Sequence, residues 1–211
     1  DLPETVSDPL AAMTVHHLLN MATGHTLDTT QRMMERGDNW AKNFLAIPPE
    51  QAPGSIFNYN SGATYMLAAI LHKLAGVTLL EYLRPRLLEP LGISQTYWQE
   101  DPKGIHIGFS GLHIVTESIA KFGQLYLQKG LWQGKQLIPE NWVKTATQKH
   151  IDCTSPVGEG IPDWDQGYGY QFWQCRHGAF RGDGKDGQFC IVLPAQDAVV
   201  AITALTGDMQ K

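Results

Sequence analysis

The clearest structural signals in this chain lie in one stretch, Pro53-Gly54-Ser55-Ile56-Phe57-Asn58-Tyr59-Asn60-Ser61-Gly62-Ala63-Thr64-Tyr65-Met66-Leu67. A Pro-Gly turn leads into a short aromatic segment, and a tyrosine then stands where a loop meets a helix. Beyond it, apolar side chains recur at steps of three and four residues. This spacing predicts a helix over residues 62–75, closed by Gly76 just past its last turn.

Tyr59, at this junction, has two interpretations. For a tyrosine considered alone, the more common one is a half-buried aromatic whose hydroxyl group finds a hydrogen-bond partner. The other is a general base, although a phenol titrates near ~10 in water. A neighbouring ammonium group would lower that pKa, whereas burial alone would raise it. The catalytic interpretation therefore requires a lysine partner, which the surrounding segment does not contain.

The segment resembles the second motif of the serine β-lactamase and penicillin-binding-protein superfamily, in the branch of class C β-lactamases, esterases and 6-aminohexanoate-oligomer hydrolases. In that branch a Tyr-x-Asn follows a Pro-Gly turn and opens a helix. Tyr59 matches the tyrosine, Asn60 fills the variable position, and Ser61 stands where asparagine is usual. A hydroxyl group is shorter than an amide and has one donor instead of two, so the role of the third residue differs. The runs Gly76-Val77-Thr78 and Glu89-Pro90-Leu91-Gly92-Ile93 extend the resemblance over nearly the whole chain.

A second part of the resemblance lies nearer the start of the chain. The run His17-Leu18-Leu19-Asn20-Met21-Ala22-Thr23-Gly24-His25 is similar to a helix that follows the nucleophile helix in the superfamily. His16 and His17 are adjacent, so on a helix they face different ways and cannot bind one ion together. These two histidines and His25 are expected to be packed in the fold or exposed to solvent.

Composition excludes several classes of protein. The 211 residues include 43% hydrophobic and 18% charged residues, which is typical of a globular protein. A net charge of -5 argues against a nucleic-acid partner, and the longest apolar run, residues 65–71, is too short to cross a bilayer. Cys153, Cys175 and Cys190 show no metal-binding spacing, although one disulfide is compatible with three cysteines.

Helical patterns occupy the first part of the chain and strand patterns the last, which predicts an α+β fold. We expect a mostly helical part over residues 1–150, which carries the tyrosine motif, and a part over residues 151–211, which holds a long loop and three antiparallel strands. The expected helices cover residues 15–23, 28–36, 38–45, 62–75, 79–88, 117–128 and 139–148, and the expected strands cover residues 168–175, 187–193 and 198–205. The resemblance implies a β-lactamase-like arrangement that this sequence truncates at both ends.

The nucleophile of the superfamily is the serine of a Ser-x-x-Lys, whose two side chains meet on one helical turn. The sequence contains one match, Ser118-Ile119-Ala120-Lys121. It follows the tyrosine motif, whereas the resemblance places the nucleophile before it. The helical pattern also predicts Ser118 and Lys121 on the polar side. We therefore expect the true Ser-x-x-Lys to precede Asp1 and the 211 residues alone to be inactive.

The third motif of the superfamily is Lys-Thr-Gly, His-x-Gly or a degenerate equivalent on a strand. Two registers compete in this chain, Lys185-Asp186-Gly187 and Gly182-Asp183-Gly184, and we favour the second. In that register Gly184 lets backbone approach the substrate, and the backbone N–H of Lys185 points at the developing oxyanion. Without the resemblance, a glycine-rich turn between strands would be the simpler interpretation.

The resemblance implies part of a serine acyl hydrolase that cleaves amide, β-lactam or ester bonds of small molecules through an acyl-enzyme. It implies catalytic roles for Tyr59, Ser61 and Lys185, with substrate contacts from Asn60, Asp183 and Gly184. No metal ion or cofactor is required, and a periplasmic or secreted bacterial location is expected. Aromatic side chains that could line the pocket are Trp98, Phe109, Trp164, Tyr168 and Tyr170.

Two alternatives remain at this point. Ser61 in place of asparagine, and the absence of Lys-Thr-Gly, also fit a non-catalytic module of the same fold that binds ligands or acts as a sensor. A weaker alternative is a structural piece that folds only with a complementary segment. Fold alone does not choose among these functions.

Overall fold

The chain divides into two compact units in the computed structural model, which describes residue 3, residues 5–153 and residues 164–206. Unit 1 contains residues 1–83 and 97–112, and unit 2 contains residues 84–96 and 113–211. The expected division near residue 150 follows the change from helices to strands. The compact units divide elsewhere, because the two helices before residue 150 pack with the strands that follow.

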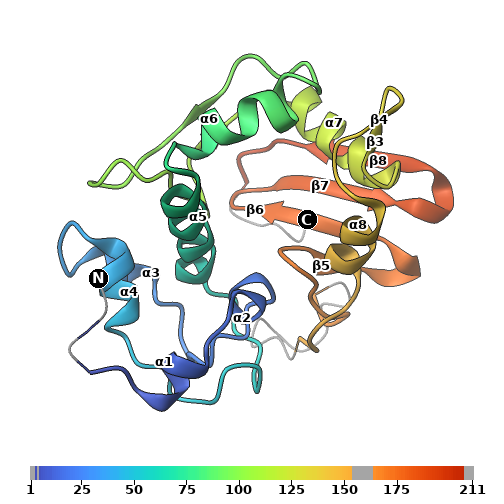
Figure 1. The fold of residues 1–211 in the computed structure, drawn as a ribbon. Coiled ribbons are helices and arrows are strands. Elements are labelled where there is room, and N and C mark those ends of the chain that lie inside the picture. The colour runs from blue at the N-terminus through green and yellow to red at the C-terminus, as the bar shows by residue number, and fades with distance from the viewer. Residues whose placement is uncertain (1–2, 4, 154–163, 207–211) are drawn as a thin grey trace. The chain divides into compact units, whose positions relative to one another are not determined.

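Unit 1 is helical, and its longest helix is α5 (Ser61–Ala75), which α2, α3, α4 and α6 contact (Figure 1). The remaining elements of this unit are α1 (Asp8–Ala12), α2 (Val15–Leu19), α3 (Thr30–Met34), α4 (Trp40–Leu45), α6 (Leu79–Leu83) and the strand β1 (Tyr97–Trp98). The strand β2 (Leu112–His113) spans the division between the units.

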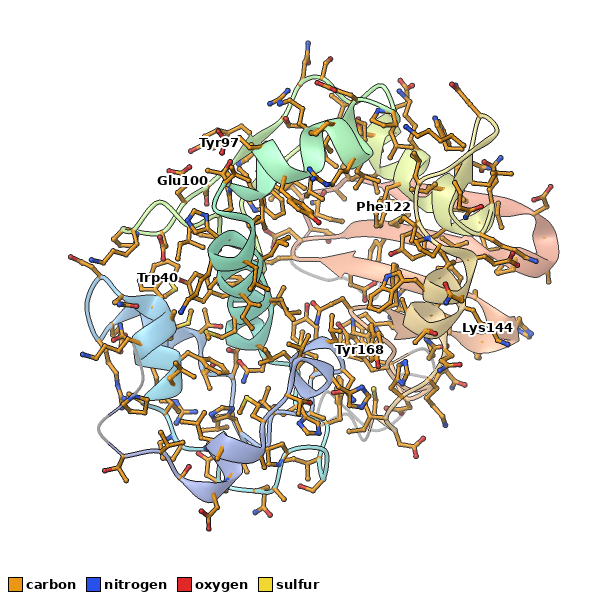
Figure 2. All side chains as sticks on the ribbon, viewed as in Figure 1. Trp40, Tyr97, Glu100, Phe122, Lys144 and Tyr168 are labelled. Atoms are coloured by element: carbon orange, nitrogen blue, oxygen red, sulfur yellow. The ribbon has the colours of Figure 1, made fainter. Side chains whose placement is uncertain are left out.

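Helix α5 forms where the sequence predicts it. Asn60 is its N-cap, and Gly76 ends it in the left-handed region at φ 68°, which glycine adopts without a steric penalty. The helix is fixed to its neighbours by Tyr65, which is fully buried. Its ring lies 5.6 Å from that of Trp40 on α4 (Figure 2), and its hydroxyl group donates to Asp101 Oδ2 at 2.6 Å.

The next helix, α6, begins with a capping box and is interrupted at a proline. The Thr78 backbone N–H donates to Glu81 Oε2 at 2.8 Å, and the Glu81 backbone N–H donates to Thr78 Oγ1 at 3.3 Å, so the capping box is present. Helix α6 then ends at Leu83, and a π-helical turn, η1 (Arg84–Leu88), continues the chain. Pro85 accounts for this change, because proline has no backbone N–H for the regular α-helical ladder.

Unit 2 combines two helices with an antiparallel sheet of order β5-β6-β7-β8 (Figure 1). Besides η1, the elements are α7 (Thr116–Leu127), β3 (Leu131–Trp132), β4 (Lys135–Gln136), α8 (Glu140–Thr147), β5 (Trp173–Gln174), the 3-10 turn η2 (Arg176–Gly178), β6 (Phe180–Gly184), β7 (Gln188–Leu193), the 3-10 turn η3 (Pro194–Gln196) and β8 (Ala198–Ile202). Helix α7 lies on β7 and β8, and Gly123 permits this approach. A Cβ atom at Gly123 would lie only 2.6 Å from Val199 Cγ1.

The core of unit 2 joins both helices to the sheet. Phe122 of α7 packs against this core (Figure 2). The buried core residues are Tyr126, Val143, Ala146, Phe172, Phe180 and Val192. Because α8 contributes two of them, the helix belongs to the same unit as the strands.

Helices followed by an antiparallel sheet confirm the α+β prediction. The sheet has four strands where three were expected, because β6 was predicted as a turn-rich connection. All three cysteines are free thiols. Among the described residues, no helix is by itself long and apolar enough to cross a membrane. Only the bent pair formed by residues 61–75 and 79–88 reaches that length and composition.

Candidate active site

Tyr59 lies at the end of the loop that precedes α5, with 42% of its surface exposed. Hydrogen bonds to Met21 fix the backbone on either side of Tyr59. The Asn58 backbone N–H donates to the Met21 carbonyl oxygen at 3.0 Å. Two residues on, the Asn60 backbone N–H donates to Met21 Sδ at 3.4 Å. The phenol is therefore accessible on a backbone that is fixed on both sides.

Asn60 is completely buried and caps α5. Its Oδ1 atom accepts hydrogen bonds from the Thr29 hydroxyl group at 2.8 Å, the Thr29 backbone N–H at 3.1 Å and the Gly62 backbone N–H at 3.1 Å. Its Nδ2 atom donates to Thr23 Oγ1 at 3.4 Å. With 0% exposure and these partners, the Asn60 side chain fixes the backbone beside Tyr59. The direct substrate contact that was expected of Asn60 finds no support in this geometry.

Ser61 is the first residue of α5 and is half-buried. Its backbone N–H donates to Asp28 Oδ2 at 3.5 Å, and Asp28 Oδ1 accepts from the Thr30 hydroxyl group at 2.6 Å. An acidic side chain therefore lies at the helix N-terminus that carries the tyrosine motif. A carboxylate in this place attracts a cation and disfavours an isolated phenolate.

The predicted third motif lies on β6 and on the turn that follows it. Gly184 pairs with Gln188 of β7, and a Cβ atom at Gly184 would lie 2.7 Å from Gln188 Cβ. Residues 182–184 are on the strand, whereas residues 185–187 form the turn, with Asp186 at φ 63°. The two competing registers thus correspond to a strand edge and a hairpin turn.

Strand β6 is longer than its neighbour β5, so only part of its edge is paired with β5. Within the described residues, strand β5 pairs with Phe180 and Arg181, and residues 182–184 extend beyond this pairing. A Cβ atom at Gly182 would have no neighbour within 4 Å among the described residues. Backbone that continues past its neighbouring strand can bind an extended ligand by main-chain hydrogen bonds.

The Asp183 side chain is bound within the fold. Its Oδ1 atom accepts from Arg181 Nε at 2.7 Å, and both side chains are more than nine-tenths buried. Burial raises the pKa of the Asp183 carboxyl, while the bond to Arg181 acts in the opposite direction. Arg181 Nη1 also donates to Cys175 Sγ at 3.0 Å. Sequence reasoning did not identify Arg181, although the i, i+2 spacing of an arginine and an aspartate on a strand places both on one face.

The Ser-x-x-Lys match at residues 118–121, which was not assigned as the nucleophile, lies on α7. The burial of its serine differs from the prediction. Ser118 was expected on the polar side, whereas it is 4% exposed. The pattern was misleading because α7 lies against the sheet and buries small residues on that face. Lys121 Nζ forms an ion pair with Glu117 Oε1 at 3.1 Å.

The aromatic candidates are divided between the units. Trp98 of unit 1 donates through Nε1 to the Ile107 carbonyl oxygen at 2.7 Å. In unit 2, Tyr168 is 2% exposed, and Tyr170 stacks on His150 with ring centroids 4.0 Å apart. These contacts place the rings in packing roles within each unit.

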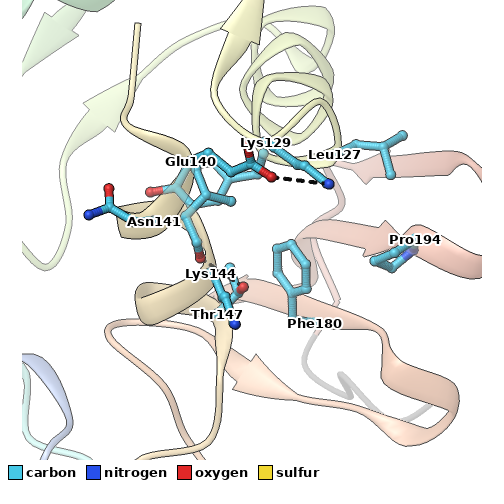
Figure 3. A pocket seen from close by; sticks show the side chains of 10 residues that line it. Leu127, Lys129, Glu140, Asn141, Lys144, Thr147, Phe180 and Pro194 are labelled. Atoms are coloured by element: carbon cyan, nitrogen blue, oxygen red, sulfur yellow. Dashed lines mark hydrogen bonds and ion pairs between the residues drawn. The ribbon is translucent and has the colours of Figure 1, made fainter. Parts of the chain in front are cut away.

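Unit 2 contains a hollow of about 720 Å³ between α7, α8 and the sheet (Figure 3). Phe180 and Pro194 line one side, and the ion pair between Lys129 Nζ and Glu140 Oε1, at 3.1 Å, lies at the other. None of the predicted motif residues lines it. The described residues include no group of three or more His, Cys, Asp or Glu that could hold a metal ion.

Comparisons with known proteins agree with this architecture. A family model described as Beta-lactamase matches residues 1–208. No curated protein matches this chain. Among solved structures, a protein from Bacillus anthracis named as a 6-aminohexanoate-dimer hydrolase shares 24% identity and a TM-score of 0.73. The match covers 92% of this chain and 55% of that one.

Two further structures share the fold. A protein from Bacteroides dorei that is named as a β-lactamase has a TM-score of 0.75 at 16% identity, over 100% of this chain and 69% of that one. A penicillin-binding protein from Bacillus halodurans has a TM-score of 0.68 at 17% identity, over 97% of this chain and 74% of that one. The chain spans about half the length of the Bacillus anthracis protein.

Proposed function

Because the chain belongs to the Beta-lactamase family, we propose that it is part of a serine acyl hydrolase in which Tyr59 is the general base or proton shuttle. The reaction class is cleavage of an amide, β-lactam or ester bond of a small molecule through an acyl-enzyme. The observation that supports this role most strongly is the accessible phenol on a fixed backbone at the N-terminus of α5.

The chemistry requires a cation near Tyr59, because a phenol alone is too weakly acidic to act as a base near neutral pH. A lysine ammonium group supplies that charge in the proposal. Asp28, at the same helix N-terminus, would help to hold it. Ser61 is proposed to orient the lysine or the substrate carbonyl with its hydroxyl group.

The serine nucleophile is proposed to lie outside these 211 residues. Ser118 supports this assignment, since it is buried and its Lys121 is paired with Glu117. A nucleophile must be reachable by substrate and close to its activating base.

The edge of β6 is proposed to bind the substrate backbone or its carbonyl oxygen. Gly184 keeps this edge free of a side chain, and the Lys185 backbone N–H is the proposed oxyanion donor. Asp183 contributes indirectly, because its carboxylate holds Arg181 on the same strand. No metal ion or cofactor takes part in this proposal.

The experiment compares wild type with Tyr59→Phe in the full-length protein. Nitrocefin and p-nitrophenyl esters are suitable substrates, and circular dichroism confirms folding. Loss of general base catalysis is expected to lower kcat by about 10²–10⁴-fold, with a smaller change in KM. Unchanged turnover in Tyr59→Phe would remove the assigned role.

A second candidate is a non-catalytic module of the same fold that binds ligands or acts as a sensor. Ser61 favours it, because a hydroxyl group at this position offers fewer hydrogen bonds than the usual amide. Incubation of the full-length protein with a fluorescent penicillin or a fluorophosphonate distinguishes the two. A covalent serine adduct that turns over supports the hydrolase, and reversible binding without an adduct supports the module.

A further inference from the structure

A chain of buried hydrogen bonds runs behind Tyr59. It begins at the Ile47 carbonyl oxygen, passes through His25 and Thr23, and ends at Asn60. His25 and Asn60 have no exposed surface, and Thr23 is 1% exposed. The separations are 2.9 Å from His25 Nε2 to the Ile47 oxygen and 2.9 Å from His25 Nδ1 to Thr23 Oγ1.

The donors and acceptors in this series of hydrogen bonds can be assigned starting from Asn60. The backbone N–H groups of Thr29 and Gly62 can only donate, so the atom of Asn60 that faces them is the oxygen. Its amide nitrogen therefore donates to Thr23 Oγ1. The Thr23 hydroxyl hydrogen is then free to be donated to His25 Nδ1.

The other end requires the same arrangement. The Ile47 carbonyl oxygen can only accept, so His25 Nε2 must carry a hydrogen. The Ile47 carbonyl oxygen thus places a proton on Nε2, and donation of the Thr23 hydroxyl hydrogen to Nδ1 makes the imidazole neutral. With this tautomer every hydrogen bond from Ile47 to Asn60 has one donor and one acceptor.

From this geometry we infer that His25 is a positioning residue for Tyr59, held as the neutral Nε2–H tautomer by Thr23 and Asn60. Its catalytic part rests on the proposed function. A proton on Nδ1 would point at the oxygen of the Thr23 hydroxyl group. The hydroxyl hydrogen would then have to turn away from His25. Asn60 caps α5 directly after Tyr59. A change in this series of hydrogen bonds therefore shifts the backbone that carries the phenol.

The surroundings of His25 oppose a charge. Burial lowers the pKa of His25, and the charge of Arg32 adds to this effect. The Ile47 carbonyl oxygen and Glu50 act in the opposite direction. The Phe44 ring of α4 makes an edge-to-face contact with the imidazole, with ring centroids 5.4 Å apart.

Nitrogen-15 NMR of the side chain tests the tautomer without any assay of activity. Wild type at neutral pH is expected to show one protonated nitrogen, Nε2. In Asn60→Asp the new carboxylate has no donor, so the Thr23 hydroxyl group turns toward it and accepts from His25 Nδ1–H. The proton affinity of His25 should therefore rise more than tenfold. A proton on Nδ1 in wild type, or unchanged titration in a folded Asn60→Asp variant, would overturn the inference.

Kinetics of the full-length protein test the positioning. Thr23→Val keeps the volume but removes the hydroxyl group, and it is expected to lower kcat about tenfold at unchanged KM. Thr23→Ser is the matched control, and His25→Gln retains one donor and one acceptor, so both should stay within about threefold of wild type. Equal losses in Thr23→Val and Thr23→Ser would refute positioning through the hydroxyl group.

Tyr59→Phe belongs in the same series, because it separates this inference from the proposed function. Full activity in Tyr59→Phe would refute the role of the phenol, while the NMR result would still decide the tautomer. Loss of activity in Tyr59→Phe together with wild-type kinetics in Thr23→Val would refute the positioning role alone.

Discussion

Asn60→Ala is expected to be one of the most destabilising single substitutions in unit 1. Alanine removes the N-cap of α5 and the acceptor of three hydrogen bonds. The Thr29 hydroxyl group can turn to another partner, but its backbone N–H and that of Gly62 cannot. Both residues are buried, so two backbone donors lose their partner away from solvent.

The magnitude follows from these losses. Each buried donor left without a partner costs about 1–3 kcal/mol, and the lost Gly62 bond is itself the N-cap bond of α5, so the cap is not counted separately. Partial relaxation of the cavity reduces the sum, so we expect a loss of about 3–5 kcal/mol in the free energy of unfolding. The free energy of unfolding of a whole domain is only about 5–15 kcal/mol, so the variant should fold but unfold at much lower urea concentration.

Asn39→Ala provides the matched control. Asn39 caps α4 through a hydrogen bond from the Lys42 backbone N–H at 3.0 Å, but it is only half-buried. Its loss should cost about 1 kcal/mol. Urea unfolding followed by circular dichroism measures both variants. Equal losses in Asn60→Ala and Asn39→Ala would show that burial of the network adds nothing, and would refute this reasoning.

The remaining predictions concern pH, the buried ion pair and the rejected nucleophile. The pKa of His25 is lowered in the fold, so as the pH falls the unfolded chain binds the proton before the folded chain does. The free energy of unfolding therefore decreases as the pH drops below the ordinary pKa of 6.5. Urea midpoints measured from neutral to acidic pH should fall less in His25→Gln than in wild type. Asp183→Ala removes the carboxylate that neutralises a buried guanidinium group and should cost about 3–5 kcal/mol, whereas Arg181→Met combined with Asp183→Leu should recover most of that loss in the same unfolding assay. Ser118→Ala in the full-length protein should change kcat by less than about twofold, because this buried serine is not the proposed nucleophile; a large fall in kcat with an unchanged melting temperature would contradict that assignment.

The parts of the fold that local chemistry determines were predictable. The helix over residues 62–75 follows from apolar periodicity and from Gly76, whose φ of 68° suits glycine. The capping box at Thr78 and Glu81, and the disruption at Pro85, are likewise properties of a few neighbouring residues. Such features depend little on the rest of the chain.

The missed features depend on contacts between distant residues. Strand β6 was not predicted because Gly182 and Gly184 have low strand propensity, and only pairing with β7 makes them a strand. The burial of Ser118 likewise results from the sheet against α7. In both cases tertiary contacts override the local pattern.

The candidate site shows the same limit. Tyr59 was identified from its motif, but no sequence pattern indicated that the Asn60 side chain would form hydrogen bonds with Thr23 and Thr29. His25 was expected only to be packed or exposed, and its two buried partners lie 2 and 22 residues away in the chain. Hydrogen-bond networks of this kind become visible only when the fold brings their members together.

The most direct test of the proposed function is the location of the acylated residue. The full-length protein is labelled with a fluorophosphonate or a fluorescent penicillin, digested, and analysed by mass spectrometry. The proposal predicts one modified serine, in a Ser-x-x-Lys outside these 211 residues, and slower labelling in Tyr59→Phe. A label on Ser118, or equal labelling of Tyr59→Phe and wild type, would contradict it.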